Sequence, residues 1–251
     1  ARIWFPYVGS IATIRRRQLE IMDSPHASRF VINWINNKVT AQIEFIKSLA
    51  EKRPKLQSEL DSRIGQMESC RDKIETLRDK EDFRNTLFGY EGITGKMYFQ
   101  CLNMIMPESF QFNGRSRQPA QDKFNAMLNY CYGILYSYVE KACIIAGLDP
   151  ALGFFHTDNY NKSSLVFDII ENFRIYADIP VTRLCTGKRI KEECFDKLEN
   201  GLSLNREGKK ALTEYFFQYL DEKVRYRNRN VSRKTTIQLE CHHTAKKLME
   251  L

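Results

Sequence analysis

The stretch from residue 153 to residue 174, GFFHTDNYNKSSLVFDIIENFR, places two acids inside a strongly apolar segment. Asp168 and Glu171 are three residues apart, so in a helix both carboxylates point to the same side. Their neighbours are leucine, valine, isoleucine and phenylalanine, which leave little of such a helix suited to facing water. A carboxylate in that setting is costly unless it is paired or binds a metal. The segment therefore predicts either a buried polar network or a metal site.

Helical periodicity dominates the rest of the chain. Ser24 and Pro25 form a helix-start signal, an N-cap serine followed by a proline at the first helical position. The helix that they begin is predicted to reach residue 49 and to pair with an amphipathic helix over residues 55–80 as an α-hairpin. Further helices are predicted over residues 82–106, 121–146, 206–224 and 232–251.

A few segments do not follow this pattern. Residues 2–14 combine aromatic and β-branched residues with proline and glycine, and we expect them to be extended. Pro180 is expected to interrupt the chain after the two acids. Residues 199–204 predict a turn or a short hairpin. The fold class is therefore mainly α, with a remnant of a β domain at the N-terminal side.

The net charge is +8 and the isoelectric point is near 9.1, which favours a polyanionic partner, either nucleic acid or an acidic membrane surface. Seven scattered cysteines without a CxxC pair indicate reduced thiols rather than a disulfide framework. No signal peptide and no apolar run of about 20 residues is visible, so we expect a cytoplasmic protein with no membrane partner. The chain begins at Ala1, and we expect that a preceding segment was removed.

Two basic segments could contact phosphates. Arg115 and Arg117 lie on a loop between a glycine and a proline, which suits a clamp for phosphate or carboxylate, although paired surface charges are an equal alternative. Residues 223–234 contain six basic residues interleaved with tyrosine and asparagine, which is typical of a nucleic-acid patch or of a solvated linker. His242 and His243 are adjacent, diverge on a helix, and are interpreted as surface residues.

His156 adds an imidazole to the two carboxylates of Asp168 and Glu171. This set of ligands suits Mg²⁺ or Mn²⁺, and such a metal acts on phosphoryl groups. Basic surroundings make phosphodiester chemistry a better match than glycoside or peptide hydrolysis. From the residues alone, a buried polar network remains the alternative.

Four blocks in a fixed order resemble the CRISPR-associated integrase family, the adaptation nucleases that insert new spacers. The resemblance covers nearly the whole chain. The blocks are GYEGITGKMYF (89–99), FQFNGRSRQPAQDKFNAMLNYCYGIL (110–135), AGLDPALGFFH (146–156) and SLVFDIIENFR (164–174).

By position, the resemblance implies metal ligands at Glu91, His156 and Asp168, with Glu171 as a further catalytic acid. It also implies a supporting role for Tyr98. The positions that it implies for DNA contacts are Arg115, Arg117, Lys162 and Arg174.

The resemblance further implies a metal-dependent DNA integrase and endonuclease that uses Mg²⁺ or Mn²⁺. Its members join the 3′-OH of a protospacer to a CRISPR repeat by transesterification, as homodimers bridged by a small ferredoxin-like partner protein in the prokaryotic cytoplasm. Residues 1–20 would be the end of an N-terminal β-rich region and its linker, and residues 21–251 the helical integrase domain. The chain could be truncated or belong to a fusion, for example behind a reverse transcriptase. The alternatives are a transposon-borne integrase of the same family and a non-catalytic nucleic-acid-binding subunit.

Overall fold

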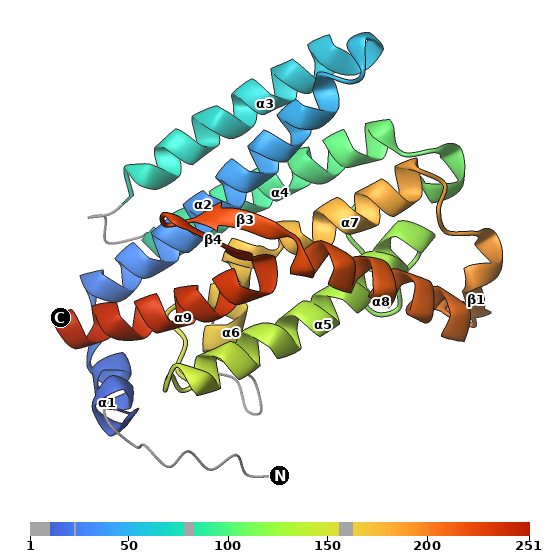
Figure 1. The fold of residues 1–251 in the computed structure, drawn as a ribbon. Coiled ribbons are helices and arrows are strands. Elements are labelled where there is room, and N and C mark those ends of the chain that lie inside the picture. Colours follow the sequence, from blue (N-terminus) through green and yellow to red (C-terminus); the bar gives the residue numbers. More distant parts are fainter. Residues whose placement is uncertain (1–10, 23, 78–82, 156–162) are drawn as a thin grey trace.

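A computed structural model describes residues 11–22, 24–77, 83–155 and 163–251, and α-helices dominate these ranges (Figure 1). The α-helices are α1 (Ile11–Ile21), α2 (Pro25–Ala50), α3 (Pro54–Glu75), α4 (Phe83–Ile105), α5 (Lys123–Ile145), α6 (Ser164–Ile169), α7 (Ile175–Thr186), α8 (Arg206–Asp221) and α9 (Arg233–Glu250). Three short 3₁₀ helices are η1 (Glu108–Phe110), η2 (Ile170–Phe173) and η3 (Glu192–Cys194). Two hairpins pair β1 (Phe195–Leu198) with β2 (Gly201–Leu204) and β3 (Lys223–Tyr226) with β4 (Arg229–Ser232). The predicted mainly α fold class is confirmed.

Helix α2 lies at the centre of the arrangement, because it packs against α3, α4, η2 and α7. Its start follows the sequence signal: the hydroxyl of Ser24 accepts a hydrogen bond from the backbone N–H of His26 at 3.2 Å, and Pro25 occupies the first turn. The side chains of Ile32, Ile43 and Ile46 on α2 are fully buried. The predicted α-hairpin of α2 and α3 is confirmed, and Figure 1 shows α3 on the outer side of the bundle.

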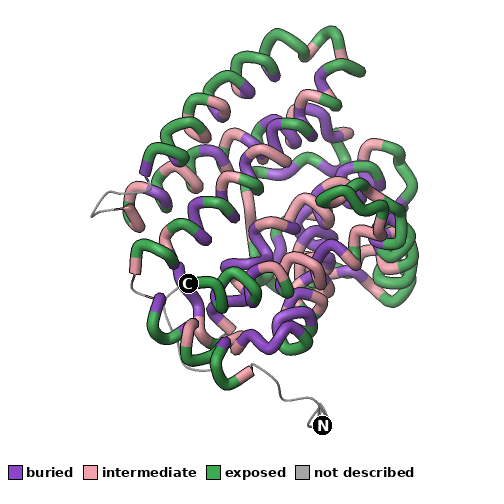
Figure 2. The backbone as a smooth tube through the Cα atoms, turned by 60° about the vertical axis from the view of Figure 1, so that its left-hand side comes forward, coloured by how far each residue is buried: buried purple, intermediate pink, exposed green. Residues whose placement is uncertain are grey.

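Helix α5 forms the second long support of the fold and contacts α6, α7, α8 and α9. The carboxylate of Asp122 caps it by accepting a hydrogen bond from the backbone N–H of Asn125 at 2.7 Å. At its other end Gly147 has a φ of +82°, the left-handed conformation that favours glycine after a helix. Figure 2 shows the buried residues gathered where the helices face one another and the exposed ones on the periphery.

Two predictions about secondary structure are wrong. Residues 11–14 are not extended but open α1, where Ile14 is buried and Ile11 approaches Gly147, so tertiary packing overrides their β propensity. Pro180 does not interrupt the chain but lies inside α7. The buried face of that helix, which includes Ala177, Val181 and Leu184, offsets the cost of one missing backbone hydrogen bond.

The apolar segment that contains the two acids is also divided differently. It was predicted as one helix, but it consists of α6 followed by η2, and α7 begins directly afterwards. The hairpin predicted near residues 199–204 is confirmed by β1 and β2. The β remnant before residue 11 lies outside the described residues, and the division into residues 1–20 and 21–251 stays a prediction. None of the helices in the described ranges is long and apolar enough to cross a lipid bilayer.

The central position of α2 gives a test of the fold. Ile43→Ala should lower the free energy of unfolding by about 2–5 kcal/mol, because the buried methyl groups leave a cavity between packed helices. The matched control is Ile93→Ala on α4, whose side chain is 45% exposed and should change stability by no more than about 0.5 kcal/mol. Urea denaturation of both variants measures the difference, and equal losses would contradict the central role of α2.

Candidate active site

A buried ammonium group joins acids from two distant parts of the chain. Lys38 of α2 donates a hydrogen bond from Nζ to Oε1 of Glu91 on α4. The same Nζ lies 2.6 Å from Oε2 of Glu171 in η2. On its other side Glu171 accepts a hydrogen bond from Nε of Arg174 at 2.6 Å. We refer to Lys38, Glu91, Glu171 and Arg174 as the Lys38 cluster.

Burial makes these charges depend on one another. Lys38 and Glu171 are almost completely buried, whereas the side chain of Glu91 is 30% exposed. Burial alone would raise the pKa of Glu171, but the charges of Arg174 and Lys38 outweigh it and hold that pKa at about 2. Burial alone would lower the pKa of Lys38, and the two carboxylates reverse this and raise it. Both partners are therefore charged at neutral pH.

Asp168 has a different structural setting. Its Oδ2 accepts hydrogen bonds from the backbone N–H groups of Phe154 and Phe155, at 2.6 Å and 3.0 Å. Gly153 makes the close approach possible, because a Cβ at that position would lie 2.6 Å from the Cβ of Ser164. Asp168 thus fixes the backbone directly before His156, and His156 itself lies outside the described residues.

The contacts described for the two acids differ: Asp168 accepts hydrogen bonds from the backbone of residues 154 and 155, whereas Glu171 pairs with Lys38 and Arg174. No three His, Cys, Asp or Glu side chains gather into a metal-binding group within the part of the chain that the structure describes. The acids that do converge there are Glu91 and Glu171, through Lys38.

A second polar cluster lies beneath the first. Asp178 of α7 is fully buried and accepts hydrogen bonds from the hydroxyls of Tyr132 at 2.6 Å and Tyr98 at 3.0 Å. Burial raises the pKa of Asp178 to about 6, although both hydrogen bonds and the nearby arginines oppose the rise. Tyr98 was predicted as a supporting residue on the same face as Glu91, and its hydroxyl binds this buried carboxyl.

Tyr132 connects the two clusters. The guanidinium of Arg174 lies 4.8 Å from the centre of its ring, and that of Arg115 lies 5.5 Å from it. Arg115 also donates hydrogen bonds to the side chains of Asn125 and Asn129. Protein groups therefore hold both arginines in place.

Of the other two predicted basic residues, the structure describes Arg117. Arg117 is exposed, and its backbone carbonyl accepts a hydrogen bond from the side chain of Asn129. Lys162 lies outside the described residues. The structure thus brings Glu91, Glu171, Arg174, Arg115 and Tyr98 into one connected region and describes neither His156 nor Lys162.

Sequence reasoning missed three residues of this region: Lys38, Tyr132 as a polar partner, and Asp178. A signal for Lys38 was present, because it follows Ile35 by three residues and precedes Gln42 by four on the buried face of α2. A lysine on such a face requires an acidic partner. Asp178 likewise stands among apolar residues in α7, but its tyrosine partners come from distant helices and leave no local pattern.

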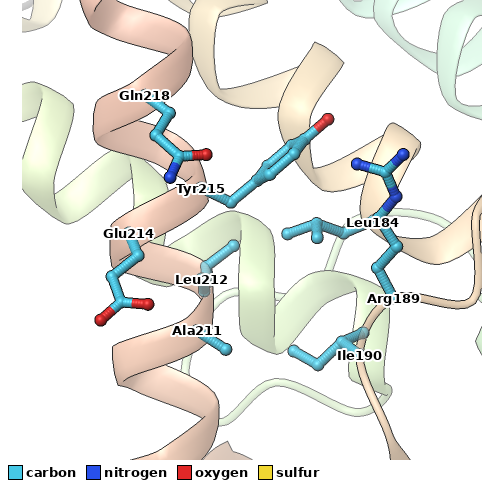
Figure 3. A pocket seen from close by; sticks show the side chains of 8 residues that line it. All are labelled: Leu184, Arg189, Ile190, Ala211, Leu212, Glu214, Tyr215 and Gln218. Carbon is cyan, nitrogen blue, oxygen red and sulfur yellow. The ribbon is translucent and has the colours of Figure 1, made fainter.

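A surface pocket elsewhere does not coincide with this site. It lies between α8 and the chain that follows α7, and Figure 3 shows Arg189, Glu214 and Tyr215 among its lining residues. None of the predicted site residues lines it. The polar side chains of the Lys38 cluster, rather than this pocket, are therefore the candidate active site.

The sequence profile of the family described as CRISPR associated protein Cas1 matches residues 1–218. The chain belongs to the Cas1 family. A relative from Archaeoglobus fulgidus, named CRISPR-associated endonuclease Cas1 1, is 32% identical over 253 residues, covering 96% of this chain and 73% of the relative. A relative of the same name from Thermodesulfovibrio yellowstonii is 28% identical and covers 83% of this chain and 65% of its own length.

Three solved structures have a similar fold, and the first of them is also a Cas1 protein. A Cas1 protein from Thermotoga maritima is 26% identical with a TM-score of 0.74, covering 96% of this chain and 69% of that one. A casposase bound to integration product has a TM-score of 0.84 at 22% identity, and the match covers 98% of this chain and 71% of the casposase chain. A chain of a partial Cas6-RT-Cas1–Cas2 complex has a TM-score of 0.81 at 19% identity, and the match covers 99% of this chain and 73% of that chain. The last two comparisons show a common fold.

The raised pKa of Asp178 gives a prediction about pH and stability. Its pKa is about 6 in the folded protein and about 3.8 in the unfolded chain, so the folded state binds this proton more tightly. The protonated Asp178 contributes fully to the free energy of unfolding below about pH 4. This contribution, roughly 3 kcal/mol, is lost as the pH rises to about 6.

Asp178→Asn removes the titrating group and should flatten this part of the pH profile. The free energy of unfolding of both proteins between pH 4 and pH 7 is the measurement. Glu222→Gln on the exposed end of α8 is the matched control and should keep the parent profile. An unchanged slope in Asp178→Asn would show that Asp178 does not titrate in this range.

Proposed function

We propose that the chain is a metal-dependent DNA integrase and endonuclease of CRISPR adaptation. The observation that carries the proposal is the convergence of Glu91 and Glu171, which are 80 residues apart in the chain, on one buried cation. Membership of the Cas1 family and the similarity to relatives named as Cas1 endonucleases support the same activity.

The donor atoms of the cluster fit a hard divalent cation such as Mg²⁺ or Mn²⁺. Two carboxylate oxygens already lie within hydrogen-bonding distance of a single positive atom, Nζ of Lys38, so one point is close to both. His156, a ligand that the family resemblance implies, is proposed to supply the third ligand. Such an ion would polarise the phosphodiester and stabilise the charge on the attacking and leaving oxygens.

The contacts favour different roles for Asp168 and Glu171, the two acids of the apolar segment. Asp168 was predicted as the metal ligand with Glu171 as a further catalytic acid. Glu171 is the one that meets Glu91 at Lys38, while Asp168 holds the backbone of residues 154 and 155. We therefore propose Glu171 as the partner of Glu91 in metal binding and Asp168 as the residue that positions His156.

The other residues of the region keep Glu171 ionised and hold the arginines that are proposed to bind a polyanion. Arg174 and Lys38 keep Glu171 ionised, as its low pKa indicates. The buried hydrogen bonds of Asp178 hold Tyr132, on which Arg174 and Arg115 stack. Arg115, Arg174, the exposed Arg117 and Lys162 are proposed to bind DNA phosphates.

The proposed reaction is an exchange of phosphodiesters. The 3′-OH of a protospacer forms a bond to a phosphorus of the repeat as the bond from that phosphorus to the original 3′ oxygen breaks. The proton lost by the incoming hydroxyl balances the proton gained by the leaving oxygen. One phosphodiester replaces another, so no external energy source is required.

The assembly of the protein is also part of the proposal. We propose a homodimer, bridged by a small ferredoxin-like partner, that acts in the prokaryotic cytoplasm, with a reverse transcriptase as a possible fusion partner. The structure of similar fold named as a partial Cas6-RT-Cas1–Cas2 complex supports a partner protein and a possible fusion to a reverse transcriptase. A transposon-borne integrase is the alternative, supported by the common fold with the casposase, and preference for CRISPR repeats over transposon ends would distinguish the two.

Glu171→Gln should lower Mn²⁺-dependent cleavage of a branched DNA by at least about 100-fold, because the cation loses a charged ligand. Glu91→Gln should cause the same loss and is the safer variant for folding, since its side chain is partly exposed. Glu44→Gln on the exposed side of α2 removes the same charge and should retain activity.

The measurement is the single-turnover rate with Mn²⁺ and with EDTA, together with the melting temperature and the DNA affinity of each variant. Full activity of a folded Glu91→Gln would contradict the proposed site. Loss of DNA binding in both glutamate variants would favour a non-catalytic binding subunit.

A further inference from the structure

The basic segment near the C-terminus is an ordered hairpin. Strand β3 pairs antiparallel with β4, with Val224 opposite Val231 and Arg225 opposite Asn230. The turn residues Arg227 and Asn228 have φ values of 44° and 64°, as a tight two-residue hairpin turn requires. The alternative interpretation of residues 223–234 as a solvated linker is therefore wrong.

One side of the hairpin is fastened to α9. Tyr226 donates a hydrogen bond from its hydroxyl to Glu240, and Arg227 donates one to the same carboxylate at 2.9 Å. The valine pair is half-buried on this side as well. Figure 1 shows the hairpin running back along the first half of α9. The hairpin therefore has a fixed position instead of extending freely into solvent.

Acidic residues around the hairpin are already used by other cations. Residues 221–240 contain six basic and three acidic side chains. Each acid has an ion-pair partner: Asp221 pairs with Lys234, Glu222 with Arg233, and Glu240 with Arg227.

The three remaining cations all lie on the two strands. Lys223, Arg225 and Arg229 are exposed, and none of them has an ion-pair partner within the residues that the structure describes. We refer to these three as the hairpin cations. Such a group of uncompensated charges on a fixed element is available to a polyanion.

Aromatic packing connects the hairpin to the candidate active site. Arg233, directly after β4, lies 3.8 Å from the ring centre of Tyr219. Tyr219 packs edge-on against Tyr176, whose hydroxyl is 2.9 Å from that of Thr236 on α9. Tyr176 follows Arg174 of the Lys38 cluster by two residues. The hairpin is thus anchored to the same start of α7 that carries Arg174.

We propose that the hairpin cations bind the phosphate backbone of the DNA on which the candidate active site acts. The inference rests on the proposed function for the identity of the polyanion. Arg225 and Arg229 can each bind a phosphate with two parallel hydrogen bonds, and Asn228 and Asn230 add neutral donors. Contacts of this kind position a duplex without reading its sequence.

The test compares two double variants that lose the same charge. Arg225→Gln/Arg229→Gln removes two hairpin cations, and Lys52→Gln/Lys55→Gln removes two exposed lysines at the turn between α2 and α3. The affinity of each protein for a fluorescent DNA duplex is measured by anisotropy at several NaCl concentrations, with EDTA present. The hairpin variant should reduce the slope of log K against log[NaCl] by about 1–2, and the control should keep the parent slope.

A third variant separates the effect of the positive charges at residues 225 and 229 from the effect of the arginine side chains themselves. Arg225→Lys/Arg229→Lys keeps both charges and should restore most of the salt slope, with equal effects on duplexes of unrelated sequence. Equal slopes for the hairpin variant and the lysine control would overturn the proposal, as would a failure of the Lys variant to restore the slope. Because binding is measured without metal and without cleavage, the outcome is independent of whether the glutamate variants lose activity.

Discussion

An ammonium group buried between helices requires carboxylates close to it, and in this chain Lys38 meets that requirement with Glu91 and Glu171. The three side chains come from α2, α4 and η2, so their contact depends on the packing of all three elements. Arg174 balances the remaining charge of Glu171. Loss of either buried partner would leave an unpaired charge, which explains why this group is fixed by so many neighbouring contacts.

Around this interaction two aspartates serve as supports. Asp168 orders the backbone at residues 154 and 155, directly before His156. Asp178 holds two tyrosine hydroxyls, and one of these rings supports both Arg174 and Arg115. The basic hairpin is attached to the same start of α7 through Tyr176. A single region of the fold thus combines converging acids with cations suited to a polyanion.

Local patterns were sufficient to predict most helices, because caps such as Ser24 and Asn205 and the spacing of buried side chains act within a few residues. They failed at residues 11–14 and at Pro180, where burial against distant helices outweighs local preference. The spacing of residues could not assign Glu91 to the site. That assignment came from the family resemblance. The different partners of Asp168 and Glu171 could not be foreseen, because Phe154, Phe155 and Lys38 lie outside the local pattern of this segment.

Glu91 and Glu171 are proposed to form one cation site, in which Asp168 is a positioning residue. Titration of Mn²⁺ binding by electron paramagnetic resonance, on the parent protein and on Glu91→Gln, Glu171→Gln and Asp168→Asn, tests it most directly. We expect one tight Mn²⁺ site in the parent protein, which both glutamine variants lose and which Asp168→Asn weakens but retains. Tight binding that survives in Glu171→Gln and disappears in a folded Asp168→Asn would contradict it.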